Sequence, residues 1–391
     1  MGYHFHGSQL RVFRKYTRID ENAELLGRSR FILLEHVLPT TAEMILHLKN
    51  VGADIFALLA KPYSIDSISL AKIKSDYNVR VIEESYATLE NTNILDNLIA
   101  EAVEKSREDS RDIVILDVGG YFSLPLSRID DEAQKYIAGV VEDTTFGHNR
   151  YLQNSKSIKV PIYSVARSNL KEIEARFVGR DAVYSMDHVL RQIGITISGR
   201  NALVIGYGMI GKNVARTLKS ADLNVNVYDK HDNKNLHAFI DGYHIHKKRE
   251  LLKNADIIFS ATGDPKGAIS FQEIEETKDN VILASVGSKD SEFDIKNLKE
   301  QSIREKEFGP NLMEYRLPHS KHVIVAKHGT AVNFILPSLP VEILDLVFSE
   351  IILCSLLLIK KDKEIERGVV NVSPDVFLDR VALDWLRFVN T

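Results

Sequence analysis

One segment, residues 201–229, constrains the fold more than any other part of the chain. An apolar strand pattern leads into Gly206, Gly208 and Gly211 in G-x-G-x-x-G spacing, a helix pattern follows, and a second apolar strand pattern ends before Asp229. Strand, glycines, helix, strand and terminal acid in one run of about 30 residues are typical of a βαβ unit that binds a dinucleotide. The segment therefore predicts a parallel α/β sheet with a cofactor at its edge.

Each glycine has its own role in such a unit. Gly206 allows the tight turn, Gly208 lets the backbone approach the pyrophosphate, and Gly211 lets the helix pack closely on the strand. The phosphates are expected at the helix N-terminus, where free N–H groups favour negative charge. Asp229 can accept the ribose hydroxyls and would repel a 2′-phosphate, which favours NAD, although Lys230 beside it leaves NADP open. The expected cofactor contacts here are Gly206, Tyr207, Gly208, Met209, Ile210, Gly211 and Asp229.

Size and charge narrow the class of protein further. A chain of 391 residues suggests two or three domains. A net charge of −4 gives no reason to expect nucleic acid or an anionic membrane as a partner. The one cysteine, Cys354, cannot form an internal disulfide, and the N-terminus lacks the layout of a signal peptide. We therefore expect a cytoplasmic protein that acts on a small molecule.

The most apolar segment, residues 343–359, is interrupted by Asp345 and Glu350. It is too short and too charged for a membrane span and indicates a buried helix or an interface helix. An interface would make the protein a homo-oligomer, whereas a buried helix would join domains. Both interpretations stay open, and a homo-oligomer is our expectation.

Strand and helix patterns alternate through the first part of the chain. Strands are expected at 31–34, 53–59, 80–82 and 113–117, and helices at 67–76 and 95–107. A further helix is expected to begin with a capping box in the stretch Pro39-Thr40-Thr41-Ala42-Glu43. A helix at 181–196 precedes the glycine segment, and strands at 255–260, 280–284 and 322–326 follow it. This pattern predicts two doubly wound parallel-sheet domains of Rossmann type. They comprise a substrate domain at 1–183, an NAD-binding domain at 184–332, and C-terminal helices at 333–391 that pack back on the first domain.

With these motifs in view, the chain resembles S-adenosylhomocysteine hydrolase over most of its length. The matching stretches, in chain order, are Glu142–Gly147 (family E-E-T-T-T-G), Lys159–Pro161 (K-V-P), Gly206–Lys212 (G-Y-G-D-V-G-K), Ala261–Gly263 (T-T-G), Val286–Asp294 (I-G-H-F-D-x-E-I-D) and His328–Asn333 (E-G-R-L-V-N). The resemblance implies an enzyme in which a tightly held NAD oxidises a ribose hydroxyl, homocysteine is eliminated, water adds, and the cofactor is regenerated.

The resemblance also implies particular contacts. Thr144 and Thr145 match family threonines near the nicotinamide ribose, Asp143 replaces a family glutamate in the substrate site, and His36 aligns with the family's N-terminal active-site histidine. The further cofactor contacts implied by these stretches are Thr262, Gly263, Gly287 and Asn333.

Several catalytic positions of the family differ in this chain. An ungapped alignment places the family's catalytic lysine on Ile173, its aspartate on Ala175 and its asparagine on Arg176. The histidine of I-G-H becomes Ser288, and the second carboxylate of L-D-D-G-G becomes Val118. The comparison with the family further implies that the histidine of its G-H-P-S stretch is missing and that its C-terminal Lys/Tyr tail is shortened. These losses argue against the standard hydrolase reaction.

Five residues are candidates for catalysis: His36, Asp143, Asp117, Arg176 and His328. Arg176 could bind a carboxylate or phosphate, and His328 could act as an acid or base. Lys171 is a possible replacement base. A shift of two positions turns it about 200° around a helix from Ile173, so a solvated surface lysine is the expected interpretation. We expect no metal site.

Three functions remain open on this basis. The first is an NAD-dependent enzyme that oxidises a hydroxyl of a nucleoside-like or other polar metabolite, with or without a coupled elimination. The second is a regulatory pseudoenzyme that binds NAD, and the third is a 2-hydroxyacid dehydrogenase-like oxidoreductase.

Overall fold

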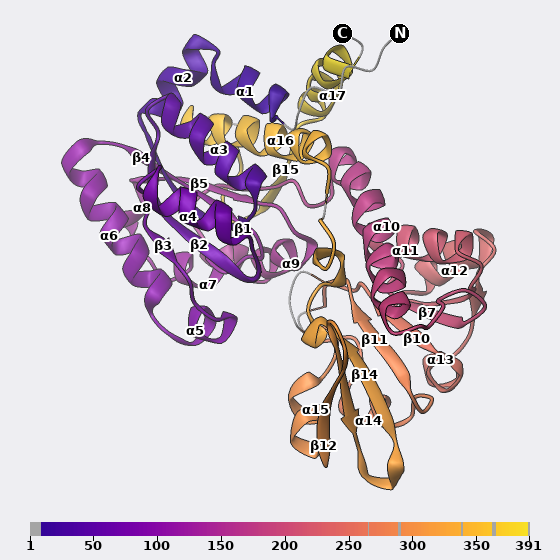
Figure 1. Ribbon diagram of the computed structural model, residues 1–391. Coiled ribbons are helices and arrows are strands. Elements are labelled where there is room, and N and C mark those ends of the chain that lie inside the picture. Colours follow the sequence, from indigo (N-terminus) through magenta and orange to yellow (C-terminus); the bar gives the residue numbers. More distant parts are fainter. Residues whose placement is uncertain (1–8, 265, 288–290, 338, 362–364, 390–391) are drawn as a thin grey trace. The chain divides into compact units, whose positions relative to one another are not determined.

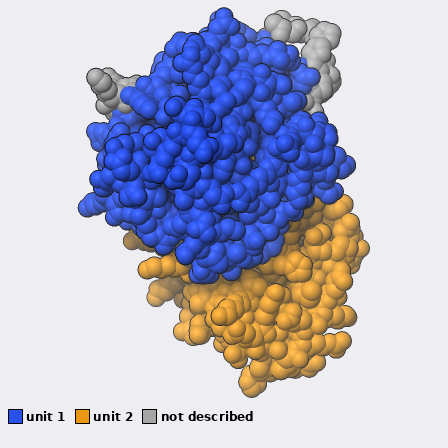
Figure 2. All heavy atoms as spheres, turned by 90° about the vertical axis from the view of Figure 1, so that its left-hand side faces the viewer, with its two compact units in different colours: residues 1–171, 340–391 blue, residues 172–339 orange. Residues whose placement is uncertain are grey.

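The computed structural model describes residues 9–264, 266–287, 291–337, 339–361 and 365–389. The chain divides into two compact units, unit 1 with residues 1–171 and 340–391 and unit 2 with residues 172–339 (Figure 2). The first division falls inside one continuous helix, α10 (Asn169–Gln192). The sequence analysis placed this first border at 183 instead. The helical pattern of α10 continues across residues 171 and 172 without a break, so it does not mark the border.

Unit 1 is built around a seven-stranded sheet in the order β15-β6-β5-β4-β1-β2-β3 (Figure 1). Every strand pair in it is parallel. The strands are β1 (Ser29–Val37), β2 (Asp54–Ile65), β3 (Val81–Ile82), β4 (Asp112–Asp117), β5 (Ile137–Glu142), β6 (Ile162–Ser164) and β15 (Val370–Val372). The helices are α1 (Arg11–Thr17), α2 (Asp20–Gly27), α3 (Pro39–Asn50), α4 (Ser67–Ser75), α5 (Tyr86–Asn91), α6 (Ile94–Asp109), α7 (Ser123–Leu126), α8 (Asp131–Gln134), α9 (Thr145–Asn154), α16 (Val341–Ile359) and α17 (Asp375–Val389).

Helix α16 is buried within unit 1, where it packs on α1, α17 and β5. Its Asp345 is 2% exposed and accepts hydrogen bonds from the backbone N–H groups of Val12 and Phe13 at 2.8 and 2.9 Å. The charge that interrupts the apolar run therefore caps the N-terminus of α1. Of the two interpretations of this segment, the structure supports the buried helix. A homo-oligomer stays a prediction, but residues 343–359 no longer provide an argument for it. No helix in the described parts of the chain is long and apolar enough to cross a membrane.

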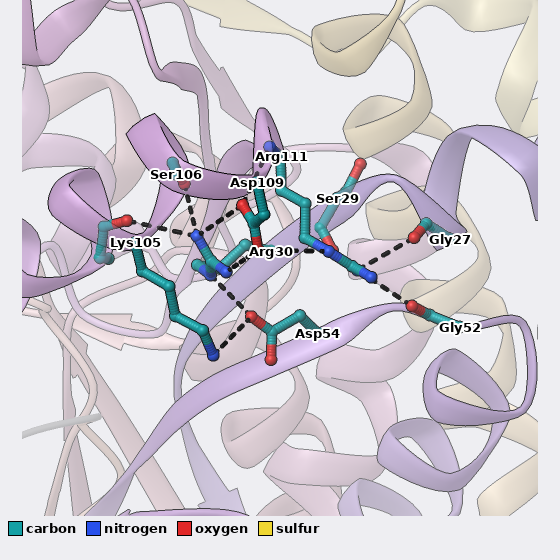
Figure 3. Close-up of polar contacts among 10 residues, drawn as sticks. Gly27, Ser29, Arg30, Gly52, Asp54, Lys105, Ser106, Asp109 and Arg111 are labelled. Atoms are coloured by element: carbon teal, nitrogen blue, oxygen red, sulfur yellow. Dashed lines mark hydrogen bonds and ion pairs between the residues drawn. The ribbon is translucent and has the colours of Figure 1, made fainter.

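A buried arginine joins elements at the amino ends of the strands in unit 1 (Figure 3). Arg30, 0% exposed, forms ion pairs at 2.6 Å with Asp54 and with Asp109 and donates to the Ser106 hydroxyl at 2.7 Å. Arg111 donates to the carbonyl oxygens of Gly27, Ser29 and Gly52 in the same region. These contacts join β1, β2 and α6 at the sheet edge opposite to the carboxyl ends.

Unit 2 holds an eight-stranded sheet in the order β12-β13-β14-β11-β10-β7-β8-β9. The strands are β7 (Asn201–Ile205), β8 (Asn224–Tyr228), β9 (His244–Ile245), β10 (Ile257–Ser260), β11 (Val281–Ser285), β12 (Arg304–Gly309), β13 (Leu312–Arg316) and β14 (His322–Ala326). The helices besides α10 are α11 (Met209–Ser220), α12 (Asp232–Ile240), α13 (Lys248–Asn254), α14 (Phe271–Glu275) and α15 (Ile295–Gln301). Apolar cores cover both faces of this sheet, as a doubly wound fold requires.

The α/β fold class with Rossmann-like sheets is thus confirmed, but several strands were not expected, among them β15, which lies in the C-terminal segment expected as helices and pairs with β6. Strands β12 and β13 pair antiparallel at one edge of the second sheet, so this sheet is mixed. No strand was expected at 304–309, because its side chains are charged and exposed. The capping box at the start of α3 was wrong: Leu38 is the N-cap without a side-chain hydrogen bond, and Thr41 donates to the carbonyl oxygen of His36.

Among the parallel strands of each sheet, the strand order reverses at one point, and ligands bind there in open α/β sheets. In unit 1 this point lies between β1 and β4, and in unit 2 it lies between β7 and β10. The candidate residues after β1 and β4, and the glycine turn after β7, therefore lie at the two positions where a site is expected.

Candidate functional site

The glycine turn of unit 2 is shaped for a dinucleotide. Gly206 has φ +92°, and a Cβ there would lie 2.5 Å from the carbonyl oxygen of Ala261. A Cβ on Gly211 would overlap the carbonyl oxygen of Gly206, so only glycine lets α11 pack this closely on β7. At Gly208, the N-cap of α11, the nearest atom to such a Cβ is Lys234 Nζ at 3.9 Å. The turn is thus closed toward the sheet and open where a pyrophosphate would approach the N–H groups of Met209 and Ile210.

Asp229 lies directly against this turn. Its carboxylate, in a residue 5% exposed, accepts hydrogen bonds from the N–H of Tyr207 at 2.7 Å and of His231 at 3.0 Å. Lys230 forms an ion pair with Asp264 at 2.7 Å, which directs its charge to Asp264 instead of the expected ribose position. An acid beside the turn, with Lys230 paired to Asp264, fits the ribose of NAD better than the 2′-phosphate of NADP.

A buried glutamate that the sequence analysis did not single out organises the other side of the site. Glu292, 2% exposed, accepts hydrogen bonds from the N–H and hydroxyl of Thr262, the N–H of Gly263 and the hydroxyl of Ser260, at 2.5–3.0 Å. A Cβ on Gly287 would lie 2.6 Å from the Glu292 carboxylate. Glu292 therefore fixes the loop after β10, and its signal was the glutamate of the I-G-H-F-D-x-E-I-D match.

The remaining candidates of unit 2 lie in different surroundings. Asn333 is 4% exposed in a short helical turn, whereas His328 is exposed in a left-handed turn with φ +55°. Arg176 is exposed on α10. Ser288 lies outside the described residues.

An ion pair in unit 1 changes the interpretation of Lys171. The Nζ of Lys171 lies 2.9 Å from a carboxylate oxygen of Asp143, and the two side chains are only 12% and 14% exposed. The expectation of a solvated surface lysine was therefore wrong. It failed because it compared Lys171 only with the position of Ile173, whereas the partner of Lys171 comes from the β5–α9 connection.

His36 lies at the carboxyl end of β1, half-buried. Its Nδ1 is hydrogen-bonded to the hydroxyl of Ser64 on β2, and its backbone N–H donates to Glu35 at 2.9 Å. Glu35 is 4% exposed, and burial, with Asp143 adding, raises the pKa of its carboxyl to about 8. A buried carboxyl group whose pKa is raised thus lies beside the histidine.

Two other acids at the carboxyl ends of the strands are occupied by the fold. Both oxygens of Asp117, 1% exposed, accept hydrogen bonds: from the N–H groups of Tyr121 and Phe122 and from the Tyr151 hydroxyl, at 2.8–3.2 Å. Glu142 accepts from the N–H groups of Gly119, Gly120 and Thr144 and from the Thr144 hydroxyl. These contacts favour structural roles for Asp117 and Glu142.

Thr144 and Thr145 begin α9. The hydroxyl oxygen of Thr144 accepts a hydrogen bond from the N–H of Gly147 at 2.9 Å and so caps the helix. Thr145 is the first residue of the helix and half-buried. The Thr144 hydroxyl therefore has a capping role independent of any cofactor.

Lys61 is a second lysine among these acids. It is 1% exposed, and its Nζ donates to the carbonyl oxygen of Val118 at 3.0 Å. Burial lowers the pKa of its amine to about 8, against the opposing charges of Glu142, Glu35 and other acids nearby. Lys61 could not be recognised from the sequence, because a lysine after an apolar strand is ordinarily a surface residue.

The fold and the two groups of residues define a class of protein. It is a two-unit α/β protein with a dinucleotide turn in one unit and, in the other, a largely buried acid–base cluster of Glu35, Lys61, Asp143 and Lys171. A family model, described as S-adenosyl-L-homocysteine hydrolase, NAD binding domain, matches residues 177–337. An adenosylhomocysteinase from Sulfolobus acidocaldarius is 30% identical over 347 residues, covering 87% of this chain and 80% of the relative. The chain belongs to the adenosylhomocysteinase family, and NAD is its cofactor.

Two further relatives show similar coverage. An adenosylhomocysteinase from Thermoplasma volcanium is 28% identical over 344 residues, which are 87% of this chain and 82% of the relative. An S-inosyl-L-homocysteine hydrolase from Methanopyrus kandleri is 28% identical over 369 residues, which are 92% of this chain and 83% of the relative. The resemblance inferred from the motifs is thereby confirmed.

Proposed function

We propose that this protein is an NAD-dependent enzyme that oxidises a hydroxyl group of a nucleoside-like substrate, with Lys171 as the base. The observation that carries the proposal is the 2.9 Å pair of Lys171 and Asp143, both largely buried, in the unit whose strand order reverses between β1 and β4. A lysine held out of water beside a carboxylate is suited to proton transfer.

The residues of the chain divide the chemistry between the two units. When bound, NAD supplies the acceptor for the hydride, and Gly206, Gly208, Gly211 and Asp229 are the residues that would hold it. In unit 1, the Lys171 amine would take the hydroxyl proton, and the Asp143 carboxylate would stabilise the ammonium that results.

A coupled elimination is a second candidate, and the hydrogen bond between His36 and Ser64 favours it. Elimination next to a new carbonyl needs a second group that moves a proton, and His36 at the end of β1 can be this group. The relatives named as hydrolases of S-adenosyl- and S-inosyl-L-homocysteine make nucleosyl thioethers the first substrates to test.

The experiment follows NADH absorbance near 340 nm and the release of free thiol with adenosine, inosine, S-adenosylhomocysteine and S-inosylhomocysteine. We expect a nucleoside-dependent signal that Lys171→Met reduces by about 10²- to 10⁴-fold. The matched control is Lys135→Met, which breaks an exposed ion pair with Glu132 in the same unit and should keep full activity.

Other results would favour the alternatives. NAD binding without any reduction on this panel would favour a regulatory pseudoenzyme. Reduction with 2-hydroxyacids alone would favour a dehydrogenase. A Lys171→Met enzyme with unchanged rates would refute the role given to this lysine.

A further inference from the structure

The buried carboxyl of Glu350 on α16 is linked to the start of α10. Glu350 is 0% exposed, and one of its oxygens accepts a hydrogen bond from the Ser168 hydroxyl at 2.7 Å. The Ser168 oxygen in turn accepts the backbone N–H of Lys171 at 3.1 Å, in the first turn of that helix. Glu350 therefore orients the hydroxyl that caps the turn bearing Lys171.

The other oxygen of Glu350 is buried, and no hydrogen bond of good geometry reaches it in the described part of the chain, although the Ser373 hydroxyl is near enough to lower the pKa of the carboxyl. A buried carboxyl with one poorly satisfied oxygen costs free energy. The fold tolerates this group in a helix that is otherwise apolar over most of its length.

The charged groups that act on the carboxyl of Glu350 come from two segments outside α16: Asp143 follows β5, and Lys171 lies on α10. Cys354, one turn further along α16, is itself affected by the charge of Glu350. Burial, with Asp143 adding, raises the pKa of Glu350 to about 7, whereas Lys171 lowers it. Asp143 and Lys171 also act on the buried carboxyl of Glu35 on β1. The carboxyl of Glu350 therefore lies within the field of the lysine.

We infer that Glu350 is a positioning residue for Lys171: it holds the first turn of α10 through Ser168 and, when ionised, stabilises the lysine as an ammonium group. This inference rests on the proposed function, since it gives Lys171 a reaction to serve. The C-terminal segment of the chain thereby contributes to the acid–base cluster of unit 1.

The test measures the protonation of Lys171 directly. Lysines are labelled with ¹³C at Cε, and the Lys171 signal is assigned as the one that Lys171→Met removes. In the NAD-loaded protein we expect Glu350→Gln to move the pH midpoint of this signal about one unit lower, because an ionised neighbour is lost. We expect the acid limb of kcat/KM to move with it and Glu350→Asp to restore both in part.

Asp345→Asn is the matched control, since Asp345 is another buried acid of α16 that caps α1. It should lower stability and leave the Lys171 midpoint unchanged. Ser168→Ala should lower kcat more than it changes KM, because it loosens the turn and keeps the charge.

An unchanged midpoint in Glu350→Gln would overturn the inference, as would an equal shift in Asp345→Asn. If Glu350→Gln fails to fold, Ser168→Ala still tests the positioning of the turn, and an unchanged kcat in this variant would overturn the inference. Full activity of Lys171→Met would refute the proposed function alone, because the coupling is read from the lysine signal without any turnover.

Discussion

The Arg30 network at the amino edge of the first sheet gives a stability prediction that can be worked from its contacts (Figure 3). Arg30→Met removes two ion pairs of 2.6 Å and a 2.7 Å hydrogen bond to Ser106 while keeping most of the side-chain volume. Removing one partner of a fully buried pair costs about 3–5 kcal/mol, chiefly because the other charge stays buried and unpaired.

The partners of Arg30 limit this cost. The side chains of Asp54 and Asp109 are 24% and 36% exposed, and each keeps another cation nearby: Lys105 at 3.5 Å and Arg111 at 3.6 Å. Water and these cations can replace part of the lost interaction, whereas the Ser106 hydroxyl, 0% exposed, loses a charged donor. We therefore expect a loss of about 2–3 kcal/mol in the free energy of unfolding.

The assay is urea unfolding followed by tryptophan fluorescence. The single tryptophan, Trp385, lies on α17 in unit 1, so its signal follows this unit without a contribution from the other. The control Arg80→Met breaks the pair with Glu101, in which both side chains are about half exposed, and should cost no more than about 0.5 kcal/mol. A loss in Arg30→Met no larger than in this control, or a gain in stability, would refute the reasoning.

Two further predictions concern the cofactor and pH. Asp229→Ala should weaken NAD binding by about 10- to 100-fold, because hydrogen bonds to a charged acceptor are lost, and should affect NADP binding less. Calorimetry measures both affinities, with Asp232→Ala, a change at an exposed residue, as the control. Equal losses of affinity for NAD and NADP would contradict the prediction. Burial, and then the Arg167 guanidinium, lower the pKa of His148 to about 4. Since the unfolded chain binds this proton near pH 6.5, the free energy of unfolding should fall as the pH drops from 6.5 to 4, by about 1 kcal/mol at pH 5 after discounting for partial hydration. His148→Asn should flatten this slope in urea titrations, whereas the exposed His237→Asn should keep it.

The glycine segment could be predicted from the sequence because its constraints are local. The turn at Gly206 and the close packing at Gly211 depend on backbone conformation within a few residues. The position of Asp229 could be predicted from the same βαβ motif, because this residue directly follows the strand that pairs with β7 and so lies beside the turn. Local rules of this kind also gave the alternating strands of the first sheet.

The acid–base cluster of unit 1 could not be predicted in this way. Glu35, Lys61, Lys171 and Glu350 come from segments up to about 300 residues apart, and no segment by itself shows which charged groups its member meets. Only the parallel order of the strands and the return of α16 onto the sheet bring them together. The sequence shows charged residues at the ends of buried strands. Only the order of the strands in the sheet reveals that these residues lie close together.

The same topology changes the meaning of the substitutions at the family's catalytic positions. On a helix, residue 175 lies one turn from Lys171 on the same face, so a carboxylate at 175 would be within reach of that lysine. This chain has the buried Ala175 there, and Asp143 provides the carboxylate from a different element. An alignment with the family counts the lysine and the aspartate as lost at Ile173 and Ala175. In the structure, an amine and a carboxylate are nevertheless paired, as Lys171 and Asp143. The substitutions at Ile173 and Ala175 are therefore weak evidence against catalysis, and the Lys171→Met comparison carries more weight than the alignment.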